Sequence, residues 1–592
     1  MPALSAATRT IETPVLIVGG GAAGLTSSLL LSRLGIVNRV VERRRAPQTA
    51  PAAHVVNART FEIFRAAGID MDAIAAACQD PADAGHVLWV TTLAGAELGR
   101  LPYERQGDDT SAFTPTPLRS LSQHRLEPIL RAAVRGSSDV AYGHEWVSTT
   151  QDGDGVTSRV RDHASGVDYE VRSRWVIGAD GAGSPVRAAL GIVPVGPDRL
   201  QSFMMIHFEA NLRALVGHRP GVLYWTTAPE ATGTFVAHDI DSTWVYMHAW
   251  DPDREAVADY SESVCAAIVR RAMGTDAHPF RIRTIRPWTM TAQIAERYRE
   301  GKIFLVGDAA HRFPPTGGLG LNTGVQDAHN LAWKIAAVED GWADDALLDT
   351  YAAERRPVAQ RNADVSLQNA LRMGEVYQAL AQLRDVDAGA AAPSAGAADG
   401  STSSSHEAAA NALRGAIANQ AEHFDMLGLQ LGFVYDAGAL VPNGAPPAGA
   451  SSVREYVPSA APGARVPHAW VTRAGARMSS LDLFAYDRFT LVAGPAGEAW
   501  ADAAGAIAQA EATAHGPVAT PLAPVVIGRD VDDPDGRWLR LLDIAADGAV
   551  LVRPDQHVAW RSRSAVTDPR AALADVLGSI LSRAWSTPWT SD

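Results

Sequence analysis

Residues 14–42 combine a strand, a glycine-rich turn, a helix and a second strand, and this succession restricts the possible folds more than any other stretch. The segment 14–18 is apolar, 22–34 has helical periodicity and is followed by Gly35, and 39–42 is again strand-like. The turn carries the pattern GxGxxG at Gly19, Gly21 and Gly24, with Ala23 inside it. These elements predict a βαβ unit, which belongs to a parallel sheet.

The same residues have the spacing of a dinucleotide site. The first two glycines let a pyrophosphate approach the helix N-terminus, and the third lets the helix pack closely on the strand. Glu42 ends the second strand, where an acid can bind ribose hydroxyls. A plain tight turn is the alternative for an isolated glycine pattern, but here the strand, the helix and the acid all stand at the positions that a dinucleotide site requires. We therefore predict nucleotide binding.

A second glycine-rich segment runs from Gly307 to Ala336, with the sequence GDAAHRFPPTGGLGLNTGVQDAHNLAWKIA. It follows a short apolar strand at 302–306, and Asp308 at the end of that strand can accept hydrogen bonds from sugar or ribityl hydroxyls. The two prolines stiffen the next turn, and the glycines after it leave backbone N–H groups uncovered for a flat ring. Asn322 begins a predicted helix to about residue 338, and its amide can pair with a ring edge. The segment therefore indicates a bound flavin.

Changes in pattern along the chain indicate several domains. Residues 118–195 return to the first sheet through a strand at 175–177, and 196–290 alternate in the manner of an antiparallel sheet that can roof a ligand pocket. Helices are expected over about 322–383, and the Ala- and Ser-rich stretch 388–410 reads as a linker. A βαβ-like segment follows from about 464. The predicted parts are a nucleotide-binding domain at 1–195 and 291–385, a substrate sheet at 196–290, a connecting segment at 386–463 and a C-terminal domain at 464–592.

Composition excludes several classes of function. The net charge of −14 argues against a nucleic-acid partner, because phosphate binding needs clustered cations. Cys78 and Cys265 are the only cysteines, so a disulfide scaffold, a CxxC redox pair and a thiolate zinc site are excluded, and a reducing cytoplasm fits best. No stretch approaches 18 uninterrupted apolar residues, so we expect no membrane span and no export signal.

The motifs together resemble the class A flavin-dependent aromatic hydroxylases, the p-hydroxybenzoate hydroxylase superfamily, and most closely its phenol hydroxylase-like branch. The resemblance covers most of the chain and is carried by HVVNARTFEIFR, by the Gly307 block and, less specifically, by VLVRPDQHVAWR. It implies an α/β (α+β) fold: a Rossmann-like FAD-binding domain, an antiparallel-sheet substrate domain and a C-terminal thioredoxin-like domain. Because CxxC is absent, that last domain has a packing or assembly role, and a homodimer is expected.

The resemblance also assigns roles to individual residues. The two turns supply the FAD phosphate, ribose and ring positions: Gly19, Gly21, Ala23, Gly24, Glu42, Arg43, Gly318, Gly320, Leu321 and Asn322. Gln123 matches an FAD-contacting glutamine, and Asp308 matches the ribityl contact. Asp180 and Gly181, which alone would read as a strand-ending turn, match a motif associated with FAD and the nicotinamide. Pro315 matches the proline whose carbonyl faces the flavin oxygen adduct.

His54 is the candidate catalytic base, because an imidazole can take a phenolic proton and enrich the ring in electrons. The alternative is a histidine that bonds to backbone. The sequence departs from the branch at Ala52, where relatives carry an arginine, and at Ser120, where an acid would match. His238, Arg119 and His124 are possible substitutes, each with a structural role as its alternative.

Two other groups of residues have simpler interpretations. His311 lacks an accompanying ligand pattern, so a structural role is expected and no metal site is predicted. Aromatic and methionine side chains on the predicted antiparallel strands can line an apolar pocket or form a core stripe: Trp225, Phe235, Met247 and Trp250.

The predicted function is an FAD-dependent monooxygenase that hydroxylates a phenolic substrate, favouring the position ortho to an existing hydroxyl. The resemblance implies NADPH or NADH as a transient co-substrate, O2 as the oxidant and a flavin C4a-hydroperoxide. There is one GxGxxG, so the nicotinamide has no Rossmann domain of its own. Rival interpretations are a monooxygenase for larger polyketide or antibiotic phenols, a non-catalytic flavin-binding sensor or scaffold, and a flavin reductase without oxygen insertion.

Overall fold

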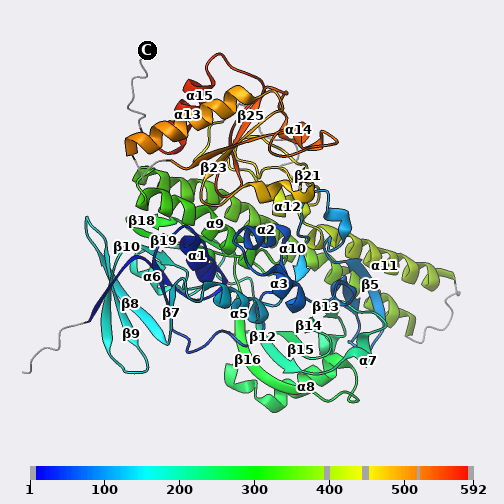
Figure 1. Ribbon diagram of the computed structural model, residues 1–592. Helices are drawn as coiled ribbons and strands as arrows, with labels where there is room; N and C mark the ends of the chain where they lie inside the picture. Colours follow the sequence, from blue (N-terminus) through cyan, green and yellow to red (C-terminus); the bar gives the residue numbers. More distant parts are fainter. Residues whose placement is uncertain (1–8, 392–399, 443–451, 516–519, 584–592) are drawn as a thin grey trace, which may run out of the picture.

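The computed structural model describes residues 9–391, 400–442, 452–515 and 520–583. Its eight-stranded sheet, called the central sheet below, lies on the left of Figure 1. Its parallel strands carry the predicted motifs: β1 (Thr10–Val18), β2 (Asn38–Glu42), β10 (Asp168–Gly178) and β19 (Ile303–Leu305). They lie side by side in the order β19, β10, β1, β2, so their carboxyl ends share one edge. Val15, Leu16 and Ile17 are fully buried, as in parallel sheets covered on both faces.

Three helices cover this sheet next to the carboxyl edge. Helix α1 (Ala22–Arg33) begins directly after the glycine turn and packs against both α5 (Gln123–Val134) and α9 (Leu319–Glu339). Helix α9 begins within the Gly307–Ala336 segment and starts three residues earlier than predicted. The two glycine-rich segments therefore meet where α1 and α9 start.

A seven-stranded, mostly antiparallel sheet forms the second layer, in the order β16-β12-β15-β14-β13-β4-β5. Its strands β12 (Gln201–Glu209), β13 (Leu223–Thr226), β14 (Gly233–Asp239) and β15 (Thr243–Ala249) agree with the predicted ones, and β16 (Arg281–Met290) extends them. Strands β4 (His86–Val90) and β5 (Glu97–Pro102) also join this sheet, and β4 runs parallel to β13. The segment 1–195 therefore contains an insertion, β4 and β5, that pairs with the antiparallel sheet.

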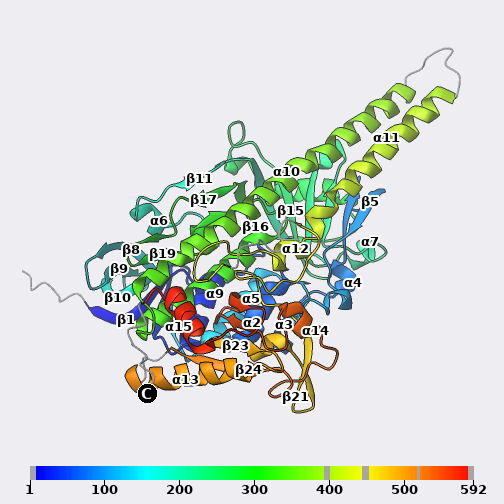
Figure 2. The same ribbon diagram turned by 90° about the horizontal axis from the view of Figure 1, so that it is seen from above.

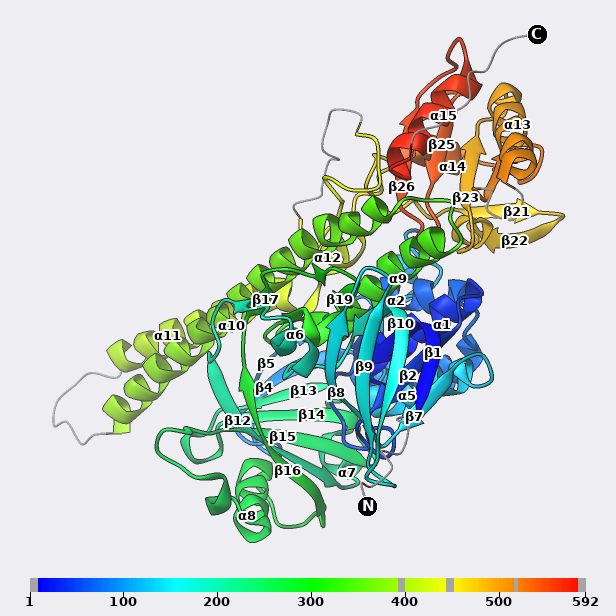
Figure 3. The same cartoon turned by 90° about the vertical axis from the view of Figure 1, so that its left-hand side faces the viewer.

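A pair of long helices replaces much of the predicted linker. Helix α10 (Thr350–Ala391) and α11 (Gly400–Ala418) pack against each other and project from the body, as Figures 2 and 3 show. Residues 388–391 and 400–410 are thus helical, whereas 392–399 lie outside the described residues. Within the described part of the chain, no helix is both long and apolar enough to cross a membrane.

The C-terminal domain is built on a four-stranded sheet in the order β24-β23-β25-β26. The strands are β23 (Phe489–Ala493), β24 (Leu522–Val526), β25 (Ala549–Val552) and β26 (Val558–Ser562). Strands β23 and β24 are parallel and flank α13 (Glu498–His515), β25 is antiparallel to β23, and α15 (Pro569–Ile580) packs against α13. This βαβ–ββα succession is the predicted thioredoxin-like topology.

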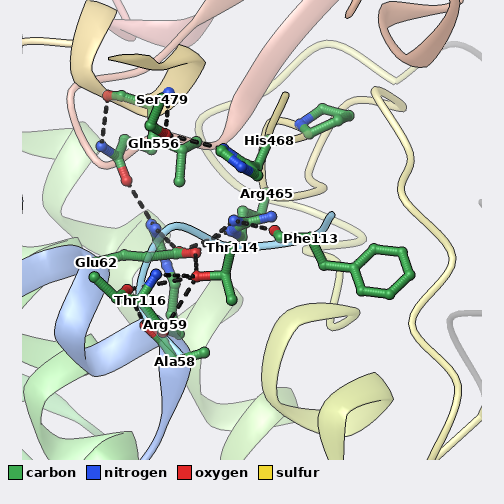
Figure 4. Close-up of polar contacts among 12 residues, drawn as sticks. Ala58, Arg59, Glu62, Phe113, Thr114, Thr116, Arg465, His468, Ser479 and Gln556 are labelled. Carbon is green, nitrogen blue, oxygen red and sulfur yellow. Dashed lines mark hydrogen bonds and ion pairs between the residues drawn. The ribbon is translucent and has the colours of Figure 1, made fainter. Parts of the chain in front are cut away.

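Buried ion pairs join the C-terminal domain to the rest of the chain (Figure 4). Glu62 on α2 (Ala58–Ala66) contacts the Arg59 guanidinium at 3.0 Å and the Arg465 guanidinium at 2.5 Å. Farther along the interface, Glu354 of α10 binds Arg553 at 2.8 Å. Both carboxylates are almost completely inaccessible to solvent, so the docking of the C-terminal domain depends on paired charges as well as apolar contact.

Candidate active site

A cavity of about 1370 Å³ opens where the carboxyl edge of the central sheet faces the antiparallel sheet and α10. Fourteen of the sixteen predicted site residues line it, and only Gly24 and Asn322 do not. In open α/β sheets, ligands bind at the carboxyl ends of the strands. The fold thus brings together motifs that are separated by hundreds of residues in the sequence.

The first glycine turn has the geometry that a dinucleotide needs. Gly19 has a φ of +110°, and a Cβ there would lie 2.2 Å from the Ala179 carbonyl oxygen. Gly21 is the N-cap of α1 and has no capping side chain, so the first N–H groups of the helix face the cavity for an anion. Gly24 lies behind the turn, because a Cβ there would be 2.0 Å from the Gly19 oxygen. Its role is the close packing of helix on strand.

Glu42 is held as an ionised acceptor at the end of β2. The backbone N–H of Gly20 donates to its Oε2 at 2.7 Å, and the N–H of Arg44 donates to its Oε1 at 2.8 Å. Burial alone would raise the pKa of Glu42, but hydrogen bonds from Arg44 and Gly20 lower it. Arg43 lines the cavity, yet Arg44 makes the ion pair with Glu42 at 3.0 Å. The sequence prediction missed Arg44.

Gln123 lines the cavity at the start of α5, as predicted, and is positioned by a residue that the sequence did not single out. Its Nε2 donates to Glu127 Oε1 at 2.7 Å, one helical turn away. Burial raises the pKa of Glu127, and its Oε2 has no hydrogen-bond partner within the described residues. The i, i+4 spacing of these two residues was the available signal for Glu127.

Asp180 and Gly181 form the turn after β10 and line the cavity. The Asp180 carboxylate accepts from the Ser184 hydroxyl at 2.5 Å and from the Val186 N–H at 2.9 Å, which fixes the start of α6 (Pro185–Ala189). Burial raises the pKa of Asp180, and these donors partly oppose the shift. Gly181 has a φ of +84°, which the turn requires.

Asp308 projects its carboxylate into the cavity at the end of β19. The surrounding protein raises its pKa by desolvation although the side chain is exposed to the cavity, and no side-chain hydrogen bond to it is made within the described residues. Its neighbour Gly307 is fixed instead by Asp327, which accepts from the Gly307 N–H at 3.1 Å and from His311 at 2.6 Å. His311 is therefore structural, as expected. Asp308 is left as an open acceptor for hydroxyl groups.

The loop after Pro315 shapes the part of the cavity predicted for the ring. The Pro315 carbonyl accepts from the Gly318 N–H at 3.0 Å, and Gly318 is the left-handed N-cap of α9. A Cβ at Gly318 would lie 2.5 Å from the side chain of Val55, so only glycine allows this approach. Gly320 and Leu321 follow on the cavity wall.

Asn322 does not contact the ring position through its amide. Its Oδ1 accepts from the Asn57 N–H at 2.9 Å and the Thr60 hydroxyl at 2.8 Å. Its Nδ2 donates to the carbonyls of Val55 and Gly318 at 3.0 and 2.7 Å. These four bonds use the full capacity of the amide, so Asn322 ties the loop to α2 instead.

His54 lines the cavity just before β3 (Val55–Val56). Its Nδ1 is buried and has no hydrogen-bond partner within the described residues. Burial lowers the pKa of His54 to about 4, so the imidazole is neutral at pH 7. The ring of His238 lies 5.4 Å away, edge to face, and also lines the cavity. Two neutral imidazoles thus face the same space.

The two departures from the branch have different consequences. Ala52 is exposed and places no cation at the cavity. Ser120 donates to Gln79 Oε1 at 2.8 Å and so does not orient His54. Among the suggested substitutes, Arg119 donates to backbone carbonyls and His124 bonds Ser122 Oγ at 2.7 Å. His238 is therefore the one that shares the cavity with His54.

The antiparallel sheet supplies an apolar wall. Along β12 buried and half-buried residues alternate, so one face meets the core under the sheet and the other meets the cavity. Trp225 and Met247 line the cavity, whereas Phe235 and Trp250 pack in or against the core. Met247 thus fits the pocket interpretation, Phe235 and Trp250 fit the core interpretation, and Trp225 belongs to both the cavity wall and a buried cluster.

The residues present fit FAD. The glycine turn with its uncapped helix suits a pyrophosphate, Glu42 suits ribose hydroxyls, and the unpartnered Asp308 carboxylate suits ribityl hydroxyls. The glycines before α9 line the same cavity as His54 and have no side chains that would obstruct a ring. When bound, FAD supplies the oxygen and electron-transfer chemistry.

Comparisons with known proteins agree with this site. Residues 12–366 match the FAD binding domain family, and 459–584 match the family described as aromatic-ring hydroxylase, C-terminal. The chain is 35% identical to 2,4-dichlorophenol 6-monooxygenase of Cupriavidus pinatubonensis over 97% of both chains, and 34% identical to a putative polyketide hydroxylase of Streptomyces coelicolor, again over 97% of both. The crystal structure of the flavin-dependent monooxygenase PieE with FAD and substrate superposes with a TM-score of 0.86, 36% identity and coverage of 97% of this chain and 100% of that one. The chain belongs to the FAD-dependent aromatic-ring hydroxylases.

Proposed function

We propose that the protein hydroxylates a phenolic ring at the position ortho to an existing hydroxyl, with NADPH or NADH as the reductant. The observation that carries the proposal is the position of His54: its imidazole lines the same cavity as the FAD-binding turns. The relatives named above for phenol and polyketide chemistry support the same class of substrate.

The chemistry at His54 follows from its burial. A neutral imidazole accepts a hydrogen bond from a phenol, and this polarises the ring toward attack by an electrophilic oxygen. The apolar wall at Trp225 and Met247 excludes water around the ring, which strengthens that hydrogen bond. Pro315 and Gly318 hold the loop that fixes the distance between flavin and substrate.

We propose that the reductant binds transiently and is not a permanently bound cofactor. The only GxGxxG of the sequence is used by the turn before α1, so a second nucleotide has to approach the cavity from outside. Asp180 and Gly181 line the cavity and are the proposed contact for the nicotinamide. We also propose a homodimer in a reducing cytoplasm, in keeping with two free cysteines, and light scattering tests the oligomeric state.

The test follows NADPH or NADH consumption with a panel of phenols in the presence of isotopically labelled oxygen. Substrate-stimulated consumption and a product heavier by one labelled oxygen atom are expected. A tightly bound flavin with no stimulation by any phenol would favour a sensor or scaffold. Consumption with an added electron acceptor under anaerobic conditions, without hydroxylated product, would favour a reductase.

A further inference from the structure

Glu104 is a cavity residue that the proposed chemistry does not use. It follows β5 and has a φ of 53°, a left-handed conformation that costs a residue with a side chain about 1–3 kcal/mol. Its backbone N–H donates to the Phe424 carbonyl at 2.6 Å, which holds the turn in place. Among the described non-glycine residues with positive φ, Glu104 is the one that lines the cavity.

One oxygen of the Glu104 carboxyl group is fixed and the other is open. Oε2 accepts from the Met426 N–H and from Gln430 Nε2, each at 3.2 Å. The adjacent Arg105 is committed to Asp425, which it binds through two hydrogen bonds of 2.8 and 3.0 Å. Oε1 makes no side-chain hydrogen bond within the described residues and is not sealed in the protein interior.

The hydrogen bonds to Oε2 leave Oε1 as the oxygen from which the protonated carboxyl group can donate. Burial raises the pKa of Glu104 to about 8, and Asp425 adds to this shift against the hydrogen bonds from Met426 and Gln430. Because Oε2 already accepts two hydrogen bonds, the proton of the neutral acid belongs on Oε1. A carboxylic acid that lines a ligand cavity can donate a hydrogen bond to an oxygen of that ligand.

Aromatic side chains connect Glu104 to the reacting end of the cavity. The ring of the preceding residue, Tyr103, lies 6.4 Å from His54 and 6.2 Å from Phe424, and Phe424 lies 5.5 Å from Trp225. Glu104, Tyr103 and Phe424 all line the cavity. These rings lie between Glu104 and His54, so the two polar groups stand at the two ends of one aromatic stretch of the cavity wall.

We propose that Glu104 donates a hydrogen bond to a second oxygen, a ring carbonyl or hydroxyl, of a fused-ring phenolic substrate whose reacting hydroxyl lies at His54. The inference rests on the proposed function and narrows it to oxygenated polycyclic phenols. A single-ring phenol without another oxygen leaves the Glu104 donor unpaired, which disfavours its binding.

The test measures binding to the oxidised FAD enzyme by the change in flavin absorbance, without reductant. Two matched pairs serve as probes: hydroxytetralone with tetrahydronaphthol, and hydroxyfluorenone with hydroxyfluorene. Each pair differs by one ring carbonyl. In at least one pair the ketone is expected to bind about fivefold more tightly, the effect of one neutral hydrogen bond. Equal affinities within both pairs would overturn the proposal, even if phenols are hydroxylated.

Variants separate recognition from structure. Glu104→Gln keeps a donor and is expected to retain the ketone preference, whereas Glu104→Leu is expected to lose it. The ratio of the two dissociation constants within one variant is insensitive to a general loosening of the site. If Glu104→Leu does not retain FAD, Glu104→Asp is used instead. Its side chain is shorter by one methylene, so the carboxyl group lies farther from the substrate. Glu97→Gln removes an exposed carboxylate from the same strand and serves as the control. A preference that survives in Glu104→Leu or Glu104→Asp would contradict the inference.

Discussion

Replacing Arg465 tests how the C-terminal domain is held. The guanidinium reaches Glu62 at 2.5 and 2.8 Å, the Tyr456 hydroxyl at 3.0 Å and the Phe113 carbonyl at 3.1 Å. Burial alone would raise the pKa of Glu62, but Arg465 and Arg59 lower it, so the carboxylate is ionised and needs its partners. Arg465→Met leaves that buried charge with Arg59 and one hydroxyl donor.

Removing one member of a buried ion pair costs about 3–5 kcal/mol, and we expect about 3 kcal/mol here because Arg59 remains. The matched control is Arg65→Met. Arg65 lies on α2, the helix that carries Glu62, and it also reaches the C-terminal domain through two hydrogen bonds of 2.8 Å to Asp482. Its side chain, however, is 41% exposed. Such a surface pair contributes about 0–1 kcal/mol.

The assay is urea unfolding of the FAD-loaded enzyme, followed by flavin release and by far-ultraviolet circular dichroism, since a chain of several domains can unfold in steps. The double variant Glu62→Gln with Arg465→Met is expected to be more stable than Arg465→Met alone, because the uncompensated charge is gone. The reasoning would be refuted if Arg465→Met lost no more free energy of unfolding than Arg65→Met. It would also be refuted if the losses of the two single variants simply added in the double variant.

Three further changes test the site. Gly24→Ala places a Cβ 2.0 Å from a backbone oxygen of the glycine turn and is expected to abolish stable flavin binding. Gly505→Ala, in the helix α13 and with nothing within 4 Å of the added Cβ, is expected to keep the flavin, and equal flavin content in the two purified proteins would contradict the reasoning. The pKa of Glu104 is about 8 in the folded protein, above its ordinary value of 4.5, so the folded state binds the extra proton and its stability falls as pH rises through this window. The thermal midpoint of Glu104→Gln should therefore rise relative to that of the wild type as the pH increases from 5 to 8. A difference between the two midpoints that does not change with pH would count against a neutral Glu104. His54→Ala is expected to lower hydroxylation about 10²–10⁴-fold with flavin content unchanged, and His218→Ala, an exposed histidine, is the control.

The flavin half of the site was predictable because each of its motifs is contiguous in sequence. Gly19 and Gly318 are required by positive φ and by close approach of neighbouring backbone or side chain, and such constraints leave a local signature. Asp308 and Asp180 follow buried strands, and parallel strands end at one edge. Strand order was therefore enough to bring these residues together.

Other features depend on contacts that no local pattern encodes. Strand β4 is apolar on both faces, so its sequence does not reveal that it pairs with β13 rather than with the central sheet. The composition of 388–410 is typical of a linker, yet α10 and α11 stabilise each other by packing, which propensity alone does not include. Asn322 has the right residue type for a ring contact, but its amide is used by α2 and the loop.

The substrate half departs from the branch at Ala52 and Ser120, and the structure shows what these departures leave in place. The cavity has no arginine at 52 and no acid at 120, and the polar groups that line it include the neutral imidazoles of His54 and His238 and the carboxyl group of Glu104. None of the three has a charged partner on the cavity wall, so each is best satisfied by a polar group of the substrate itself. A ligand that supplies a hydroxyl to one end and an oxygen acceptor to the other satisfies both ends at once, whereas a simple phenol satisfies one. Under the proposed function, the polar groups of this cavity therefore favour a substrate with two oxygen functions.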